Sequence, residues 1–445
     1  MGTRSGWSRG AAVAVAVCAI VFLPSLLDAD PADPAPPSVG HTNFLSPHVR
    51  PIAVHGGLVY AANTPSDTVD VIDAATDQVI ARIAVGIDPV TVAVRPDGKE
   101  VWVSNHISDS VSVIDTDPAS ATYHQVIATI GDFDPITHAT RFDEPAGIAF
   151  ASDAKAYVAL SSQDQIAIVD VATRSVTGHL DINAQDPRAI AVHGDRLFVL
   201  PFESNNQTQL SGCLAPALDP KCTFDVVAHV LEENDVLSEG YVSDLIREPA
   251  IPDRDLYVFD TGTDTLVEIV DTLGTLLYGI AIDSTGKIFV AQTDARNDAN
   301  GLTGTAGHGL AELENRAFLN RITVVDGCMS GSCGAPQFID LEPLPPVHPA
   351  PGMALATPFG IRVTPDDATV VATAAGSHKL FTLDPATGAV LGRADVGYVP
   401  RGLVLDTNGA ATHAWVLNAV DNSVSKVDLT SPSNPVVLAT IPLED

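Results

Sequence analysis

The chain has 445 residues, of which 46 % are hydrophobic and 18 % are charged, so it can bury an extensive core and is not wholly disordered. Its 23 basic and 55 acidic residues give a formal net charge of −32. That charge repels phosphate backbones and anionic lipid headgroups at long range. Nucleic acid is therefore not an expected partner, and no membrane contact is expected beyond an N-terminal anchor.

The N-terminus has the order of a secretory signal. Arg4 and Arg9 precede an apolar run from Ala11 to Leu27, and the polar, proline-rich "DADPADPAPPSVG" follows. The run is shorter than the roughly 20 residues that span a membrane. We predict a signal peptide over 1–29, or an anchor if it is retained, and a proline-rich linker over 30–48. The mature chain is then periplasmic, exposed at the cell surface, or secreted.

A short stretch of the chain recurs with a similar sequence. "LVYAANTPSDTVDVID" at 58–73 returns as "EVWVSNHISDSVSVID" at 100–115. The ending of two apolar residues and an aspartate recurs along the chain, at Asp73, Asp115, Asp170, Asp260, Asp326, Asp384 and Asp428. Each aspartate is predicted to end a strand and to accept hydrogen bonds from the N–H groups of the following turn.

Each repeat contains further strands around this one. Upstream of the aspartate-ending strand lie strands rich in small residues, such as "PVTVAV", "PAGIAF" and "PRGLVL". A further strand, such as "EVWVSN", lies between the small-residue strand and the aspartate-ending strand. Four short antiparallel strands repeated seven times, with a period near ~40 residues, predict an all-β chain. The expected fold is a seven-bladed β-propeller over residues 49–445, with four-stranded antiparallel blades. Radial packing buries both faces of each blade, and closing the ring removes exposed edges.

Long insertions interrupt the predicted blades at 131–144, 203–254, 293–319 and 342–357. Because strands alternate in direction, all four insertions are expected on the same face of the propeller. The spacing of apolar residues in "DVVAHVLEENDVLSEGYVSDLIREP" predicts a small helical or irregular insertion in blade 4. Loops of this length usually bind something, although neutral insertion is an alternative because loop entropy grows slowly with length.

The repeats "VYAANTPSDTVDVID", "VWVSNHISDSVSVID" and "WVLNAVDNSVSKVD" resemble those of YVTN-type β-propellers, which are exported bacterial and archaeal proteins. The resemblance covers nearly all of residues 41–445 and is weakest in blades 4 and 5. It implies the propeller fold and says little about function. Some similar proteins continue into a haem-binding cytochrome c region, which implies a redox partner as one kind of binding target.

The cysteines past the leader come in two close pairs. We predict two disulfides that cross-link loops, Cys213 with Cys222 and Cys328 with Cys333. Zinc binding is the weaker interpretation because neither spacing is CxxC. No CxxCH occurs, so no haem attachment and no other cofactor is expected in this chain.

A calcium site is an open alternative in "TDARNDANG" at 293–301. This stretch offers Asp294, Asn297, Asp298 and Asn300 as oxygen ligands, but it does not follow the EF-hand spacing.

Aligned repeats place three arginines at the start of the innermost strands. Arg50, Arg188 and Arg401 superimpose on Tyr278 and Phe359, so these five residues are predicted to ring one mouth of the axial channel. Guanidinium groups suit bidentate capture of a carboxylate or phosphate. The alternative is structural, because each arginine can pair with a carboxylate such as Asp186 or donate to carbonyl oxygens.

The sequence therefore favours a monomeric binding or interaction module for a small anionic ligand, a peptide or a partner protein, rather than an enzyme. The alternative is a metal-dependent, lactonase-like hydrolase with its site at the channel mouth. Such sites typically hold metal with Glu, Asn and Asp near the axis. Asn63, Asn105 and Asn418 stand at aligned strand ends, but no glutamate lies on the innermost strands.

Overall fold

The computed structural model describes residues 47–203, 209–211, 245–247, 253–296, 316–406 and 411–443. Residues 39–445 form one compact unit. The fold is all-β and antiparallel; in the described ranges helix is confined to the short 3₁₀ turns η1 (Thr64–Ser66), η2 (Ser161–Gln163) and η3 (Ala375–Ser377). None of the helices in these ranges could cross a membrane. The predicted leader (1–29) and most of the linker lie outside the described residues.

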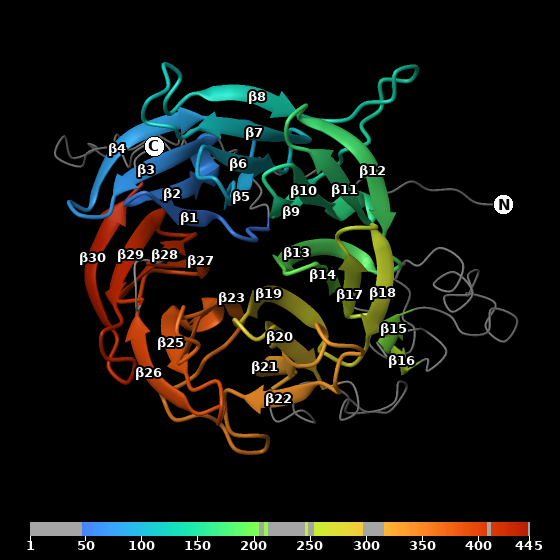
Figure 1. Cartoon of the computed structure of the whole chain (residues 1–445). Coiled ribbons are helices and arrows are strands. Elements are labelled where there is room, and N and C mark those ends of the chain that lie inside the picture. The colour runs from blue at the N-terminus through green and yellow to red at the C-terminus, as the bar shows by residue number, and fades with distance from the viewer. Residues whose placement is uncertain are drawn as a thin grey trace, which may run out of the picture. The chain divides into compact units, whose positions relative to one another are not determined.

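Five sheets have four strands each, joined in chain order (Figure 1). They are β1 (Ile52–His55), β2 (Leu58–Asn63), β3 (Thr68–Asp73) and β4 (Gln78–Ala84); β5 (Pro89–Val94), β6 (Glu100–Asn105), β7 (Ser110–Asp115) and β8 (Val126–Ile130); β9 (Pro145–Ser152), β10 (Lys155–Leu160), β11 (Gln165–Asp170) and β12 (Ser175–Asp181); β23 (Pro358–Val363), β24 (Val370–Ala374), β25 (Lys379–Leu383) and β26 (Val390–Asp395); β27 (Pro400–Leu405), β28 (His413–Asn418), β29 (Ser423–Asp428) and β30 (Val436–Pro442).

Two further four-strand units are joined into one eight-stranded sheet. The first has β13 (Gln185–His193), β14 (Arg196–Glu203), β17 (Leu256–Asp260) and β18 (Thr265–Val270), and the second has β19 (Leu276–Ile282), β20 (Ile288–Ala295), β21 (Phe318–Val325) and β22 (Gln337–Asp340). They join where the end of β14 extends far enough for Glu203 to pair with Leu276.

The insertion between β14 and β17 contains a two-stranded antiparallel sheet of β15 (Gln209–Ser211) and β16 (Leu245–Arg247). The sequence predicted a helical or irregular structure for 225–249, and the structure corrects this for residues 245–247, which are a strand because they pair with β15. The other residues of that expectation lie outside the described ranges.

The first strands of the units line the middle of a propeller-like arrangement (Figure 1). Each contacts the next along the chain, from β1 to β5, β9, β13, β19, β23 and β27, and β27 contacts β1. Glycines allow the close approach: a side chain at Gly147 would collide with the carbonyl of Arg188, and one at Gly279 with the carbonyl of Phe359. The small residues of the first strands therefore have a steric cause.

One pairing recurs between the first and second strands of the units. A small residue lies opposite an aromatic one in Ala53–Tyr60, Ala93–Trp102, Ala149–Tyr157, Ala191–Phe198, Ala281–Phe289 and Val404–Trp415. These aromatic rings are buried between neighbouring units and form much of the core. The exception is in β23, where Arg362 takes the place of the small residue and lies opposite Val371.

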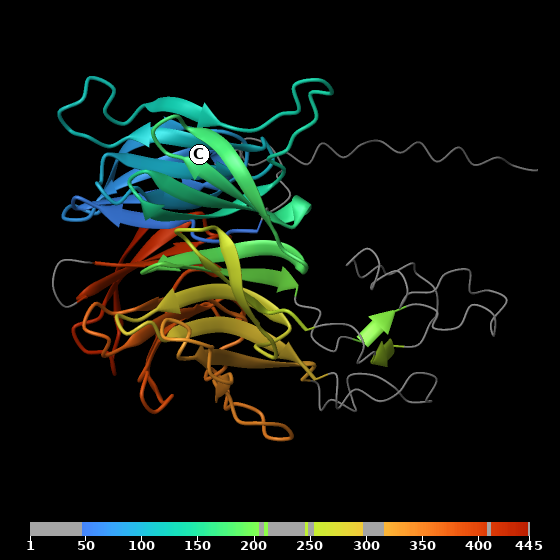
Figure 2. The same cartoon turned by 45° about the vertical axis from the view of Figure 1, so that its right-hand side comes forward.

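The aspartates that end the third strands have the predicted structural role. Each accepts at least one hydrogen bond from a turn N–H, and the donors are Ala75, Asp117, Thr173, Gly262, Gly327, Ala386 and Thr430 for the seven positions in chain order. These turns lie at the end of the sheets opposite to the long connections 131–144 and 342–357. In Figure 2, β8 is the teal strand at the top, and the turn that precedes it and the connection that follows it extend from opposite ends of the strand.

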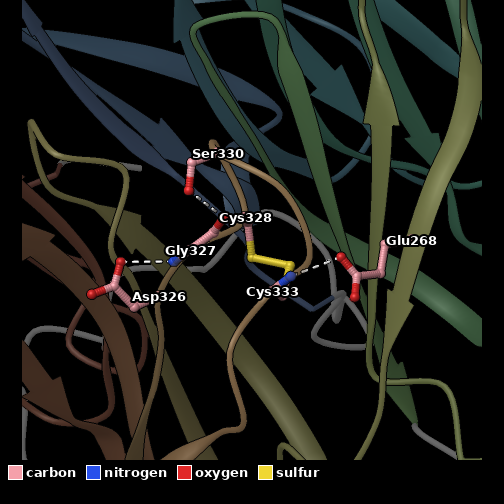
Figure 3. The surroundings of a disulfide bond; sticks show 6 residues. All are labelled: Glu268, Asp326, Gly327, Cys328, Ser330 and Cys333. Atoms are coloured by element: carbon pink, nitrogen blue, oxygen red, sulfur yellow. Dashed lines mark hydrogen bonds between the residues drawn. A yellow bond between two sulfur atoms is a disulfide. The ribbon is translucent and has the colours of Figure 1, made fainter.

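The disulfide between Cys328 and Cys333 is confirmed (Figure 3). It closes the turn between β21 and β22, and the N–H of Cys333 donates to Glu268 on β18 of the preceding unit, at 2.8 Å. The disulfide thus holds a turn that also links two units. The other predicted pair, Cys213 with Cys222, lies outside the described residues.

Candidate ligand-binding mouth

Five side chains form a continuous row where the first strands begin; we call Arg188, Phe202, Tyr278, Phe359 and Arg401 the mouth cluster. The guanidinium carbon of Arg188 lies 4.0 Å from the ring centroid of Phe202. The ring centroids of Phe202 and Tyr278 are 5.4 Å apart, and those of Tyr278 and Phe359 are 5.1 Å apart. Arg401 completes the row, 5.6 Å from the centroid of Phe359.

Local backbone geometry places four of these side chains, all except Phe202, at the lumen. The register between first and second strands shifts around each position, between Pro187 and Ala189, Leu277 and Gly279, Pro358 and Ile361, and Pro400 and Gly402. A bulge of this kind re-aims the side chain of the extra residue. The residues before the prolines, including Asp186, Thr357 and Val399, have positive φ, which turns the chain sharply into the strand.

Arg188 already has a carboxylate partner. Its Nε donates to Oδ1 of Asp186 at 2.7 Å, and a second guanidinium nitrogen pairs with Oδ2. Burial raises the pKa of Asp186, and the charge of Arg188 opposes that rise. The predicted structural alternative therefore holds for this arginine, although its guanidinium still faces Phe202.

Arg401 is different, because in the described part of the chain it has no carboxylate partner and its buried Nε has no hydrogen-bond acceptor. Desolvation, and then the charge of Arg188, lower its pKa. Its own charge also reaches His48, whose pKa is lowered to about 3 by burial and by Arg401. The mouth therefore carries one uncompensated positive charge within a chain that is strongly acidic.

Arg50 does not join the mouth cluster. Its backbone aligns as predicted, but its guanidinium donates to the carbonyl oxygen of Ile280 in β19, at 3.0 Å. Burial lowers its pKa to about 10. The expected ring of three arginines is thus two, with Arg50 engaged inside the lumen.

Two residues of the lumen were not predicted from the sequence. Phe202 follows Pro201, which stands where the second strands of other units carry residues such as Asn105, so this unit departs from the repeat. Arg362 occupies a position that is alanine or valine in the other units. Aligning the repeats shows this difference, so the sequence contained a signal for Arg362.

The loops at the same end of the sheets as the mouth cluster expose apolar side chains. The connections from second to third strands and from one unit to the next carry exposed Ile87, Ile107, Phe133, Ile136, Leu344, Val347, Met353, Tyr398 and Val420. The described turns at the opposite end of the sheets expose no large apolar side chain. Exposed apolar surface in the loops is therefore concentrated at the end of the sheets that bears the mouth cluster.

A cavity of about 450 Å³ adjoins the mouth cluster at Tyr278. Its lining includes Thr293, Phe318 and the ion pair of Arg316 with Glu342, whose nitrogen and oxygen are 3.0 Å apart. The carboxylate of Glu342 also accepts from the N–H of Leu355, so the pair fixes the loop after β22. The cavity gives the mouth a side chamber with both apolar and polar walls.

The amide nitrogens of the asparagines considered for a metal site donate within their own sheets. Asn105 donates to Ser110 and Ser112 at 3.2 and 3.0 Å, and Asn418 donates to Ser423 and Ser425 at 3.1 and 2.9 Å. Asn63 donates to Asp70 at 3.2 Å. Their amides thus tie second strands to third strands. Across the described ranges, no His, Cys, Asp and Glu side chains gather as a metal-binding group.

Of the calcium candidates, Asp294 pairs with Arg321 at 2.6 Å. Its carboxylate is therefore engaged in an ion pair. Asn297, Asp298 and Asn300 lie outside the described residues.

Comparison with known proteins supports the fold alone. No protein-family model matches the chain, and no curated sequence is similar to it. Among solved structures, a chain of the hydrazine synthase of Kuenenia stuttgartiensis is similar, with a TM-score of 0.60 and 18 % sequence identity over 87 % of this chain and 96 % of that one. At this identity the likeness extends to the fold and not to activity.

Proposed function

We propose that this chain is an exported, seven-bladed β-propeller of the YVTN type that binds a protein segment at the mouth cluster, through a carboxylate of that segment. The contacts of each first strand with the next, and of β27 with β1, support a closed ring. The Cys328–Cys333 disulfide is consistent with an oxidising compartment outside the cytoplasm. The N-terminal sequence pattern supports export.

The observation that carries the proposal is the state of Arg401. Its guanidinium is half-buried beside the ring of Phe359, and in the described chain no carboxylate forms an ion pair with it. A partly desolvated cation that lacks a counter-ion gains strongly from a charge-assisted hydrogen bond. A carboxylate entering the mouth would accept from Arg401 and would also relieve the repulsion between Arg401 and Arg188.

The apolar loops point to a protein rather than to a small ion as the source of the carboxylate. A small ligand would contact only the mouth cluster, and side chains such as Ile136 (85 % exposed) and Val420 (59 % exposed) would remain in water. Interfaces between proteins combine apolar anchors with a few desolvated charges. The apolar loops and the Arg401 charge lie at the same end of the sheets, which favours a peptide segment or a partner protein as the ligand. A redox protein is one candidate partner.

A selection experiment tests this function. A random peptide library with free C-terminal carboxylates is presented to the purified chain, and the same library with amidated C-termini serves as the comparison. We expect enrichment of peptides that carry a carboxylate together with apolar residues. Equal enrichment from both libraries, with no preference for acidic residues, would contradict the role of the mouth.

A matched pair of variants assigns the binding to the mouth. Arg401→Gln removes the uncompensated charge. Arg393→Gln, on the outer strand β26, removes another half-buried arginine whose Nε also has no acceptor in the described chain. Binding of enriched peptides is expected to be lost in the first variant and kept in the second.

A further inference from the structure

A second pair of arginines lies deeper in the lumen than the mouth cluster. Arg50 reaches from the start of β1 to the carbonyl of Ile280 in β19, and these strands belong to units that are not neighbours in the series of contacting first strands. Its side chain therefore crosses the lumen. Ile280 follows Gly279, where an added Cβ would meet the carbonyl of Phe359 and the side chain of Ile361, so the Arg50 guanidinium ends beside the part of β23 that carries Arg362. Burial, and then the charge of Arg50, lower the pKa of Arg362.

The two guanidinium groups have few partners. Arg50 makes one side-chain hydrogen bond, to Ile280, and Arg362 makes one, from Nη1 to the carbonyl of Ile361 at 2.7 Å. A guanidinium has five N–H donors. In the part of the chain that the structure describes, no carboxylate forms an ion pair with either arginine. Two like charges thus share a poorly solvated space without a counter-ion from these residues.

The surroundings determine what kind of counter-ion fits. At the level of Arg362 the other units contribute Ala53, Ala93, Ala149, Ala191, Ala281 and Val404. These side chains offer no hydroxyl or amide donors. Phosphate or sulfate, with more charge and more acceptor oxygens, would be left with unsatisfied oxygens there. A monovalent halide requires only the N–H donors that the two arginines supply.

We propose that Arg50 and Arg362 hold a buried halide ion, with chloride as the natural occupant, in the axial lumen below the mouth. The ion links the first unit to the sixth across the lumen, so it stabilises the ring and plugs the channel. This site goes beyond the proposed function, because the mouth cluster binds its partner from outside and shares neither arginine with it.

Chloride titration tests the site. The full chain is transferred to chloride-free gluconate buffer, and the melting temperature is measured as chloride replaces gluconate at constant ionic strength. A ligand bound only by the folded state raises the melting temperature as its concentration increases. We expect this rise in the wild type and in Arg401→Gln, and not in Arg362→Ala.

The Arg362→Ala variant is expected to fold, because alanine is the residue at this position in most units. In chloride-free buffer its melting temperature should equal or exceed that of the wild type, since one of two repelling charges is gone. A melting temperature that does not depend on chloride in the wild type would overturn the proposal.

Crystals grown with bromide locate the ion. An anomalous peak between the guanidinium groups of Arg50 and Arg362 is the expected result. A peak only at Arg401 would overturn the lumen site while supporting anion binding at the mouth. Absence of both peaks would overturn the lumen site and leave the peptide selection as the separate test of the mouth.

Discussion

Lys426 of β29 donates from Nζ to the carboxylate of Asp77 at 2.7 Å, across 349 residues of sequence. It also donates to the carbonyl of Ala74 at 2.8 Å. Nearby, Asn422 donates to Oδ1 of Asn63 at 3.2 Å, which links the same two units. The last unit is thus tied to the first by polar contacts as well as by the contact of β27 with β1.

Lys426→Met tests the contact between the last unit and the first. Loss of a cross-unit ion pair and a hydrogen bond is expected to lower the free energy of unfolding by about 1–2 kcal/mol, measured by urea denaturation. Lys379→Met is the control, because Lys379 pairs with Asp395 between neighbouring strands of one sheet and Asp395 is exposed. The control should change stability by about 0.5 kcal/mol or less. Equal effects of the two variants would argue against a structural role of the contact between the last unit and the first.

Replacing Gly279 tests the packing of first strands. An added Cβ there meets the backbone carbonyl of Phe359, which cannot move freely. Gly279→Ala is expected to destabilise the chain by about 1–3 kcal/mol, as overpacking does in cores. Gly178→Ala is the control, because its Cβ would lie 3.5 Å from a flexible methyl group of Ile168 on the outer strands. A tolerated Gly279→Ala would show that the strands approach less closely than described.

The turn aspartates predict acid sensitivity. Hydrogen bonds from the backbone and side chain of Thr173 lower the pKa of Asp170 below its ordinary value of 3.8, and backbone donors lower the pKa of Asp73, Asp260, Asp384 and Asp428 likewise. A carboxylate whose pKa is lower in the folded state stabilises the fold fully above the unfolded pKa. That stabilisation is lost as the pH falls through the folded pKa.

Asp170→Asn isolates one of these contributions. The difference in free energy of unfolding between wild type and variant should be largest above about pH 5, and it should shrink as the pH falls below the ordinary carboxylate range. Urea denaturation from pH 6 downward measures it. A difference that grows on acidification would contradict the assigned role.

The strands and their turns were predictable because their determinants are local. An aspartate before a turn accepts hydrogen bonds from N–H groups two or three residues away, as Asp73 does from Ala75 and Thr76. The same short sequence therefore forms the same turn in every repeat. The small residues of the first strands could be recognised in the sequence because they recur in every repeat. The disulfide at Cys328 was predictable from its short spacing.

The direction of long side chains was not predictable. Arg50 and Arg401 occupy equivalent backbone positions, but Arg50 extends to Ile280 and Arg401 remains beside Phe359. Several rotatable bonds separate each guanidinium from the backbone, so its end point depends on contacts between units distant in sequence. The joining of two units through Glu203 and Leu276 had no signal in the repeat either, because it depends on the extra length of β14.

The measurement that bears most directly on the mouth cluster is isothermal titration of one selected peptide whose only carboxylate is at its C-terminus, in free-acid and amidated forms, against wild type, Arg401→Gln and Arg393→Gln. We predict that amidation and Arg401→Gln each weaken binding at least about tenfold, equivalent to 1.4 kcal/mol, and that Arg393→Gln leaves it unchanged. If the amidated peptide binds as tightly as the free acid, or if Arg401→Gln binds as tightly as the wild type, the mouth cluster is not the carboxylate site.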